Sequence, residues 1–73
     1  MNWVEQLAKF AEDNGWEFYN NEDVDYMRYT TIRLFNPKNQ RGYKHIMLTS
    51  ELNTPGNCNR IVKEICYRAE QAL

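Results

Sequence analysis

Residues 26–50 decide the fold, and they read YMRYTTIRLFNPKNQRGYKHIMLTS. Residues 26–35 and 43–49 are rich in Tyr, Thr, Ile and Leu, and this composition favours β-strands. The run between them, NPKNQRG at 36–42, contains Asn, Pro and Gly, which favour turns. The stretch therefore predicts two antiparallel strands joined by a turn.

A helical pattern lies on each side of this hairpin. Apolar residues recur at helical spacing in residues 3–14, where Asn2 can cap the start and Gly15 can end the helix. A second helix is predicted to begin at Pro55, because proline is favoured at the first helical position, and to run to Leu73. Residues 16–19, WEFY, alternate and predict a short first strand.

The predicted element order is therefore α-β-β-β-α in a single domain, residues 1–73. We expect an α+β fold in which a three-stranded antiparallel meander carries both helices on one face. The second face of such a sheet is then exposed to solvent.

Charge is distributed unevenly along the chain although the net charge is only -1. Residues 1–25 contain seven acids and one base, whereas residues 26–73 contain eight bases and three acids. Such a division can create opposed surface patches that orient a partner. The alternative is that the two halves interleave in the fold and their fields cancel.

The two cysteines, Cys58 and Cys66, fall in the last helical pattern, eight residues apart. This spacing separates them by about 12 Å along a helix axis, whereas a disulfide needs Cα atoms within about 7 Å. We therefore expect two reduced, half-buried thiols. The sequence shows no signal peptide and no apolar run of membrane-spanning length, so we expect a cytoplasmic protein.

Alternation along the two longer strands predicts which side chains face solvent. The aliphatic Ile32, Leu34, Ile46 and Leu48 fit a core under the helices. The solvent-facing side is then predicted to carry Tyr29, Arg33, Phe35, Tyr43, His45 and Met47. Because Tyr, Phe, Arg and Met anchor protein interfaces, we expect a partner to bind there. Aromatic pairs that only stabilise the sheet, or a bulge that turns part of the pattern inward, are the alternatives.

The loop after the first strand is acidic. Glu22, Asp23 and Asp25 are expected to add charge complementarity to the same partner.

The sequence offers no constellation for catalysis. His45 is the single histidine, and it has no cysteine or acid at catalytic spacing. The set His45, Cys58 and Cys66 lacks metal-ligand spacing, and the three isolated glycines form no phosphate loop. We therefore expect no enzyme activity, no metal and no cofactor.

Two resemblances extend this interpretation. The element order, the length and the final Ala69-Glu70-Gln71-Ala72-Leu73 resemble a double-stranded RNA-binding domain. That family carries a lysine cluster at the start of its last helix, where this chain has Asn59, Arg60 and Lys63. The resemblance implies a nucleic-acid-binding module, and the basic residues available to contact phosphates are Lys38, Arg41, Lys44, Arg60 and Lys63.

The same element order in so short a chain is also similar to small phage-encoded inhibitors, including some anti-CRISPR proteins. This resemblance implies a protein that binds a host nuclease by surface mimicry and has no catalytic residues. Our first hypothesis is therefore a non-enzymatic interaction protein that binds and occludes a host protein or nucleoprotein complex. Nucleic acid is the second candidate partner, and a homodimer through the solvent-facing side of the sheet is another. A membrane is not expected as a partner.

Overall fold

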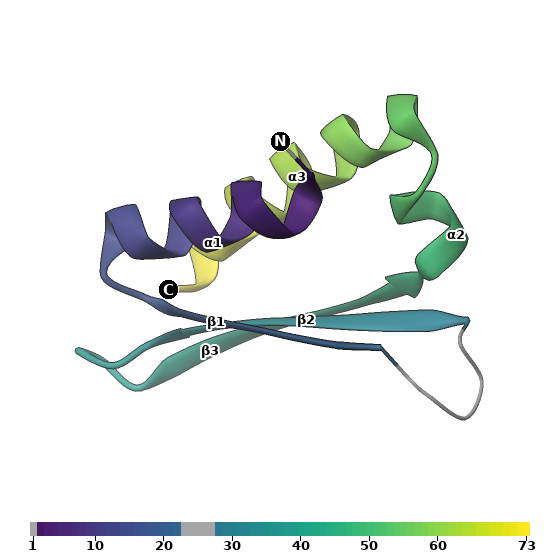
Figure 1. The fold of residues 1–73 in the computed structure, drawn as a ribbon. Coiled ribbons are helices and arrows are strands. Elements are labelled where there is room, and N and C mark those ends of the chain that lie inside the picture. Colours follow the sequence, from purple (N-terminus) through teal and green to yellow (C-terminus); the bar gives the residue numbers. More distant parts are fainter. Residues whose placement is uncertain (1, 23–27) are drawn as a thin grey trace.

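The chain folds into a three-stranded antiparallel sheet with helices on one of its faces (Figure 1). This fold is taken from a computed structural model, which describes residues 2–22 and 28–73. In chain order the elements are α1 (Trp3–Asn14), β1 (Glu17–Glu22), β2 (Tyr29–Asn36), β3 (Arg41–Leu48), α2 (Thr49–Leu52) and α3 (Pro55–Ala72). The predicted α+β class and meander are confirmed, with the short helix α2 as an addition.

Both ends of α1 form as the sequence predicts. The Asn2 side-chain oxygen accepts a hydrogen bond from the backbone N–H of Glu5 at 2.8 Å, which satisfies one of the free donors at the helix start. Gly15 ends the helix in the left-handed conformation, with a φ of 73°. The chain then turns directly into β1, and the Phe10 and Trp16 rings pack edge to face across this turn with centroids 5.5 Å apart.

The second long helix, α3, begins at Pro55 and carries an ion pair between Glu64 and Arg68, one turn apart, at 2.8 Å. The Thr54 hydroxyl does not cap it and instead donates to the carbonyl oxygen of Ser50. Cys58 and Cys66 are free and half-buried, as expected.

The connection between β3 and α3 contains the unpredicted helix α2. Its Thr49 hydroxyl lies 2.7 Å from that of Thr30, and its backbone N–H donates to the Arg28 carbonyl. Leu52 is buried in the core. Four residues are too short for a periodic pattern, so the sequence could not indicate this turn of helix.

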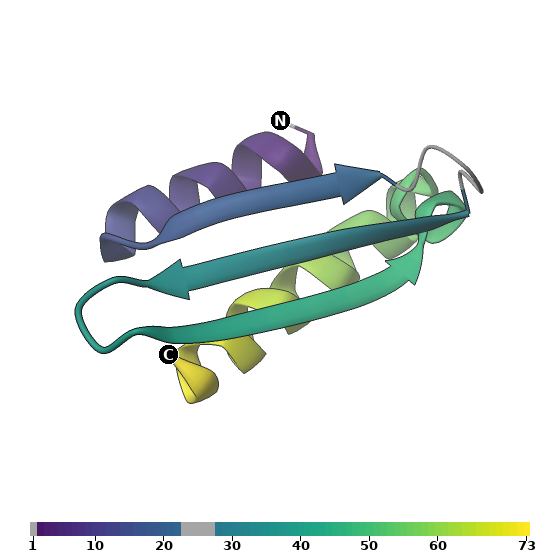
Figure 2. The same ribbon diagram turned by 90° about the horizontal axis from the view of Figure 1, so that it is seen from below.

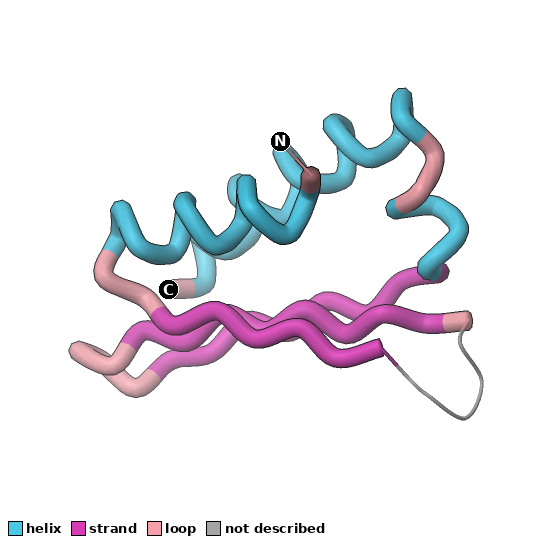
Figure 3. Tube along the Cα trace, viewed as in Figure 1, coloured by secondary structure: helices cyan, strands magenta, loops and turns pink. Residues whose placement is uncertain are grey.

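The two long helices lie over one face of the sheet, and the other face is uncovered (Figures 1 and 2). Helix α1 packs against β1, and α3 packs against β3 and α1. Loops are confined to the ends of the elements (Figure 3). The core between the layers is formed by Leu7, Ala11, Ile32, Leu34, Met47, Leu52, Ile61, Val62, Ile65 and Ala69.

A four-residue turn, residues 37–40, sets the pairing of β2 with β3. The Gln40 N–H donates to the Asn36 carbonyl, and Gln40 takes a positive φ of 59°. The Asn36 and Asn39 side-chain oxygens accept from the backbone N–H groups of Lys38 and Arg41, at 3.0 Å each. Asn36 therefore pairs with Arg41, and even-numbered residues of β2 share a face with odd-numbered residues of β3.

This pairing corrects the predicted orientation of β3. Ile32 lies opposite His45 and Thr31 lies opposite Ile46. Since residues paired across antiparallel strands share a face, Tyr43, His45 and Met47 lie on the helix side, and Ile46 and Leu48 lie on the uncovered side. The predicted orientation of β3 was wrong by one residue. The prediction placed Ile46 and Leu48 in the core because they are the more aliphatic of the two alternating groups of side chains on this strand. The orientation of β2 was predicted correctly, with Thr30, Ile32 and Leu34 buried.

Candidate functional site on the open sheet face

The uncovered side of the sheet is the candidate site, and we call it the open face. Its described side chains come from alternate positions of all three strands. They are Glu17 and Tyr19 of β1, Tyr29, Thr31, Arg33 and Phe35 of β2, and Lys44, Ile46 and Leu48 of β3.

The open face gathers most of the large apolar side chains that the described part of the chain exposes. Tyr19 is 54% exposed, Tyr29 48%, Ile46 55% and Leu48 39%. The fifth such residue, Tyr67, lies on α3 and is 66% exposed. Isolated exposed apolar residues are normal on a protein surface, but a group of them on one face marks an interaction site.

Cross-strand pairing arranges the open face in rows. Tyr29 pairs with Leu48 and Thr31 with Ile46, so the exposed apolar side chains of Tyr29, Ile46 and Leu48 lie close together on β2 and β3 near α2. Phe35 pairs with Gly42 at the end near the β2–β3 turn. A Cβ built on Gly42 would lie 4.0 Å from Cδ2 of Phe35, so the Phe35 ring leans over the space that the missing side chain leaves.

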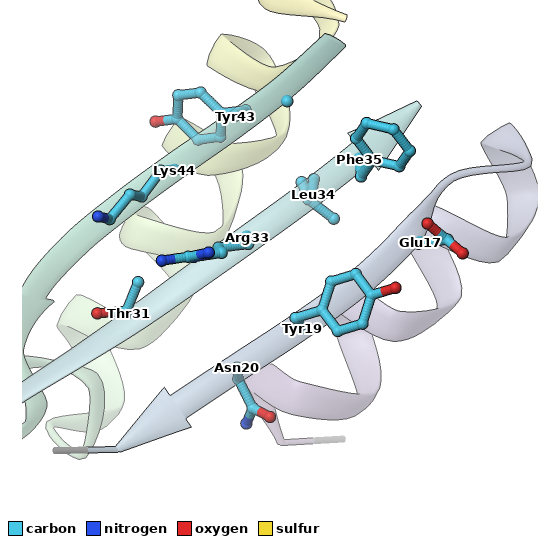
Figure 4. A pocket seen from close by; sticks show the side chains of 10 residues that line it. Glu17, Tyr19, Asn20, Thr31, Arg33, Leu34, Phe35, Tyr43 and Lys44 are labelled. Atoms are coloured by element: carbon cyan, nitrogen blue, oxygen red, sulfur yellow. The ribbon is translucent and has the colours of Figure 1, made fainter. Parts of the chain in front are cut away.

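A row of polar and aromatic side chains crosses the middle of the open face. Tyr19, Arg33 and Lys44 are consecutive partners across β1, β2 and β3, and Figure 4 shows them side by side. Together with Phe35, Thr31 and Glu17 they line a shallow depression. A concave patch with aromatic walls and two cationic groups suits an anionic or polar group of a partner.

A separate polar cluster lies on the helix side of β3. The Tyr43 hydroxyl lies 3.1 Å from Nδ1 of His45, and the Glu64–Arg68 pair of α3 faces both rings. Burial lowers the pKa of His45, against the attraction of the Glu64 carboxylate, and burial raises the pKa of Tyr43, against the effect of Arg68. These groups therefore help to join α3 to β3 in their neutral forms.

The structure separates the predicted partner-binding residues into three groups. Tyr29, Arg33 and Phe35 lie on the open face, as predicted. Tyr43, His45 and Met47 do not, because β3 presents its other side there. The backbone of Glu22 ends β1, and Asp23 and Asp25 lie outside the described residues, so the role of the acidic loop stays a prediction.

Sequence reasoning missed Tyr19, Ile46 and Leu48 as members of the surface. Tyr19 could have been found, because its neighbour Phe18 packs against the core and alternation sends Tyr19 to the other side. For Ile46 and Leu48 the only signal is the length of the turn, which sets the register.

The five basic residues of the nucleic-acid hypothesis do not form one surface. Lys44 lies on the open face, while Lys38 and Arg41 lie at the β2–β3 turn. Arg60 and Lys63 are exposed on α3, in the layer on the opposite side of the sheet (Figure 1).

Two kinds of feature are absent from the described residues. No three His, Cys, Asp or Glu side chains in residues 2–22 and 28–73 gather closely enough to hold a metal ion. None of the described helices combines the length and the apolar character that crossing a bilayer requires.

Comparison with protein-family models, with curated proteins and with solved structures gave no match to this chain.

Proposed function

We propose that this chain is a non-enzymatic interaction protein that binds a partner protein through its open face. One observation carries the proposal: four of the five large apolar side chains that the described residues expose lie on this one face. Two are tyrosines and two are aliphatic, and they lie on a sheet whose other face packs against the helices. Aromatic and aliphatic contact area on a rigid surface is what a protein interface requires.

The mode of action we propose is occlusion of a functional surface on a host protein or nucleoprotein complex in the cytoplasm. The resemblance in length and element order to small phage-encoded inhibitors supports this proposal. A sheet whose other face packs against helices would present this surface already formed, and a preformed surface limits the entropic cost of binding.

Nucleic-acid binding is the second candidate, and one observation favours it. Tyr19 is the cross-strand partner of Arg33, which in turn pairs with Lys44, and an aromatic ring on the same face as cations can stack a base while the cations contact phosphate. We rank it second because Ile46 and Leu48 occupy the adjoining part of the surface, and aliphatic side chains neither stack bases well nor pair with phosphates. The basic side chains on α3 also lie on the opposite side of the molecule.

The test is affinity purification from a host lysate with two matched tyrosine variants. Tyr29 on the open face and Tyr67 on α3 are both exposed, so Tyr29→Ser and Tyr67→Ser make the same chemical change on different faces. We expect Tyr29→Ser to lose a stoichiometric partner protein that the wild type and Tyr67→Ser retain. Loss of the partner from Tyr67→Ser alone would move the site to α3, and salt-sensitive recovery of nucleic acid in its place would favour the second candidate.

A further inference from the structure

We infer that the middle of the open face binds a carboxylate of the partner protein, held between Arg33 and Lys44 and flanked by apolar contacts. This inference rests on the proposed function, because it specifies the chemistry of the segment that the open face accepts. The partner segment would be acidic where it meets this pair and aliphatic or aromatic where it meets Tyr29, Ile46 and Leu48.

The first argument is the pairing itself. Arg33 and Lys44 are direct cross-strand partners on β2 and β3, and their side chains share the open face. Like charges directly opposite each other destabilise a sheet. The fold therefore keeps two cations in an arrangement that costs stability unless an anion lies between them.

The second argument is that nothing in the described chain neutralises the pair. Among the described side chains the ion pair found is Glu64–Arg68 on α3, which lies against the other side of the sheet. Glu17 shares the face but makes no ion pair with either cation. No described acidic side chain therefore neutralises Arg33 and Lys44, and their charge is available to a ligand.

The third argument is the surrounding surface, which selects the class of ligand. Tyr19 and Phe35 line the same depression as the two cations, so their rings offer apolar contact area beside an anion held there. A guanidinium binds a carboxylate through two parallel hydrogen bonds. The exposed apolar side chains of Tyr29, Ile46 and Leu48 then favour a protein segment over a polyanion, because a polyanion would leave them uncovered.

A second copy of the chain fits this site less well. A symmetric face-to-face dimer centred on the row would bring the Arg33 and Lys44 side chains of both copies together. Their repulsion would oppose association, so we assign the site to a different protein with an acidic segment.

The experiment is a titration of the isotope-labelled chain followed by amide chemical shifts, with three probes. The first is a synthetic peptide of alternating glutamate and serine with a central leucine, the second is its glutamine counterpart, and the third is a thymidine oligonucleotide. We expect the acidic peptide to shift the amides of Tyr19, Arg33 and Lys44, and the glutamine peptide to bind about tenfold more weakly or worse.

Matched variants complete the test. Arg33→Gln and Lys44→Gln should each weaken binding of the acidic peptide and also raise the melting temperature at low salt by roughly 1–5 °C, because one half of the like-charge pair is gone. The rise should shrink as salt screens the repulsion. Lys63→Gln, a change at an exposed lysine of α3, should alter neither quantity.

Three outcomes would overturn the inference. The first is equal binding of the acidic and glutamine peptides, and the second is no shift at Arg33 and Lys44 with the acidic peptide. The third is stronger binding of the oligonucleotide at the same amides. If the glutamine peptide binds the open face equally well, the proposed protein-binding function stands and only its charge preference fails. If the Tyr29→Ser variant still captures its partner, the function itself fails.

Discussion

Asn36 donates a hydrogen bond from its side-chain amide to the carbonyl oxygen of Leu73, at 3.2 Å and 37 residues away in the chain. Asn39 donates to the same oxygen at 3.0 Å. The last carbonyl groups of a helix have no partner within the helix, so these amides satisfy the end of α3 and attach it to the β2–β3 turn. The same two side chains also shape the turn through their oxygens.

Asn36→Ala should therefore destabilise the protein by about 1–3 kcal/mol, because it removes a buried side chain that both donates and accepts. Asn39→Ala is the matched control. It breaks an equivalent pair of hydrogen bonds at an exposed position, where water can replace them, and should cost clearly less. Urea unfolding of the two variants measures the difference, and equal costs would contradict this account of the turn.

Adjacent residues of β3 test the orientation of the strand. Met47→Ala should cost about 2–5 kcal/mol, because Met47 is buried under the helices. Ile46→Ala should change the free energy of unfolding by only about 0.5 kcal/mol, because Ile46 is on the open face. Chemical denaturation of both variants gives the answer, and the reverse order of costs would return β3 to the orientation that hydrophobicity alone suggests.

Apart from α2, the elements and their order could be predicted because each has a local signal. Asn2 and Gly15 mark α1, Pro55 marks α3, and the alternation of Thr30, Ile32 and Leu34 marks the buried side of β2. The orientation of β3 could not be predicted in this way, since it depends on the length of the turn and on what α3 places opposite. Hydrophobicity alone favoured burial of Ile46 and Leu48, which instead lie on the open face.

His45 makes stability depend on pH in the weakly acidic range. Burial lowers its pKa from the ordinary 6.5, so the unfolded chain takes up a proton at a higher pH than the folded chain does. The free energy of unfolding should therefore be highest above about pH 7 and should fall as the pH drops toward about 5. Thermal melts across this range should show a flatter profile for His45→Gln, and an unchanged profile would contradict the prediction.

Tyr43 acts at the alkaline end of the pH range by the same logic. Its pKa is raised, chiefly by burial, so its contribution is complete below about pH 10 and is lost as the pH rises above that value.

Two glycines should respond to the same substitution with opposite signs. Gly15 has a φ of 73°, a left-handed conformation that strains alanine, so Gly15→Ala should destabilise the protein by about 1–2 kcal/mol. Gly56 lies in the first turn of α3 with no atom within 4 Å of an added Cβ, so Gly56→Ala should stabilise it by roughly 0.5–1 kcal/mol. Melting temperatures of the two variants provide the check, and a shift of the same sign in both would contradict it.

The sequence predicted the type of candidate site but only some of its residues. Composition and alternation indicated a sheet face with interface-type residues, and Tyr29, Arg33 and Phe35 belong to it. The pairing of Arg33 with Lys44 was beyond the sequence, because it exists only in this register. His45 and Tyr43 lie on the helix side, where each offers the other a hydrogen-bond partner and both meet polar groups of α3. No local sequence pattern shows these contacts, so the sequence could not predict this position.

The strand order β1-β2-β3 leaves β3 as an edge of the sheet, with backbone groups that no described strand pairs. Such an edge can template another strand and start aggregation, and a lysine in the middle of the strand opposes this. Lys44 is such a lysine, so its charge protects solubility as well as serving a ligand. Lys44→Gln should form fibrillar aggregate at a lower concentration than Arg33→Gln, although both remove one positive charge, because Arg33 lies on the fully paired central strand. Dye-binding assays on the two variants would show whether this surface trades conformational stability for resistance to aggregation.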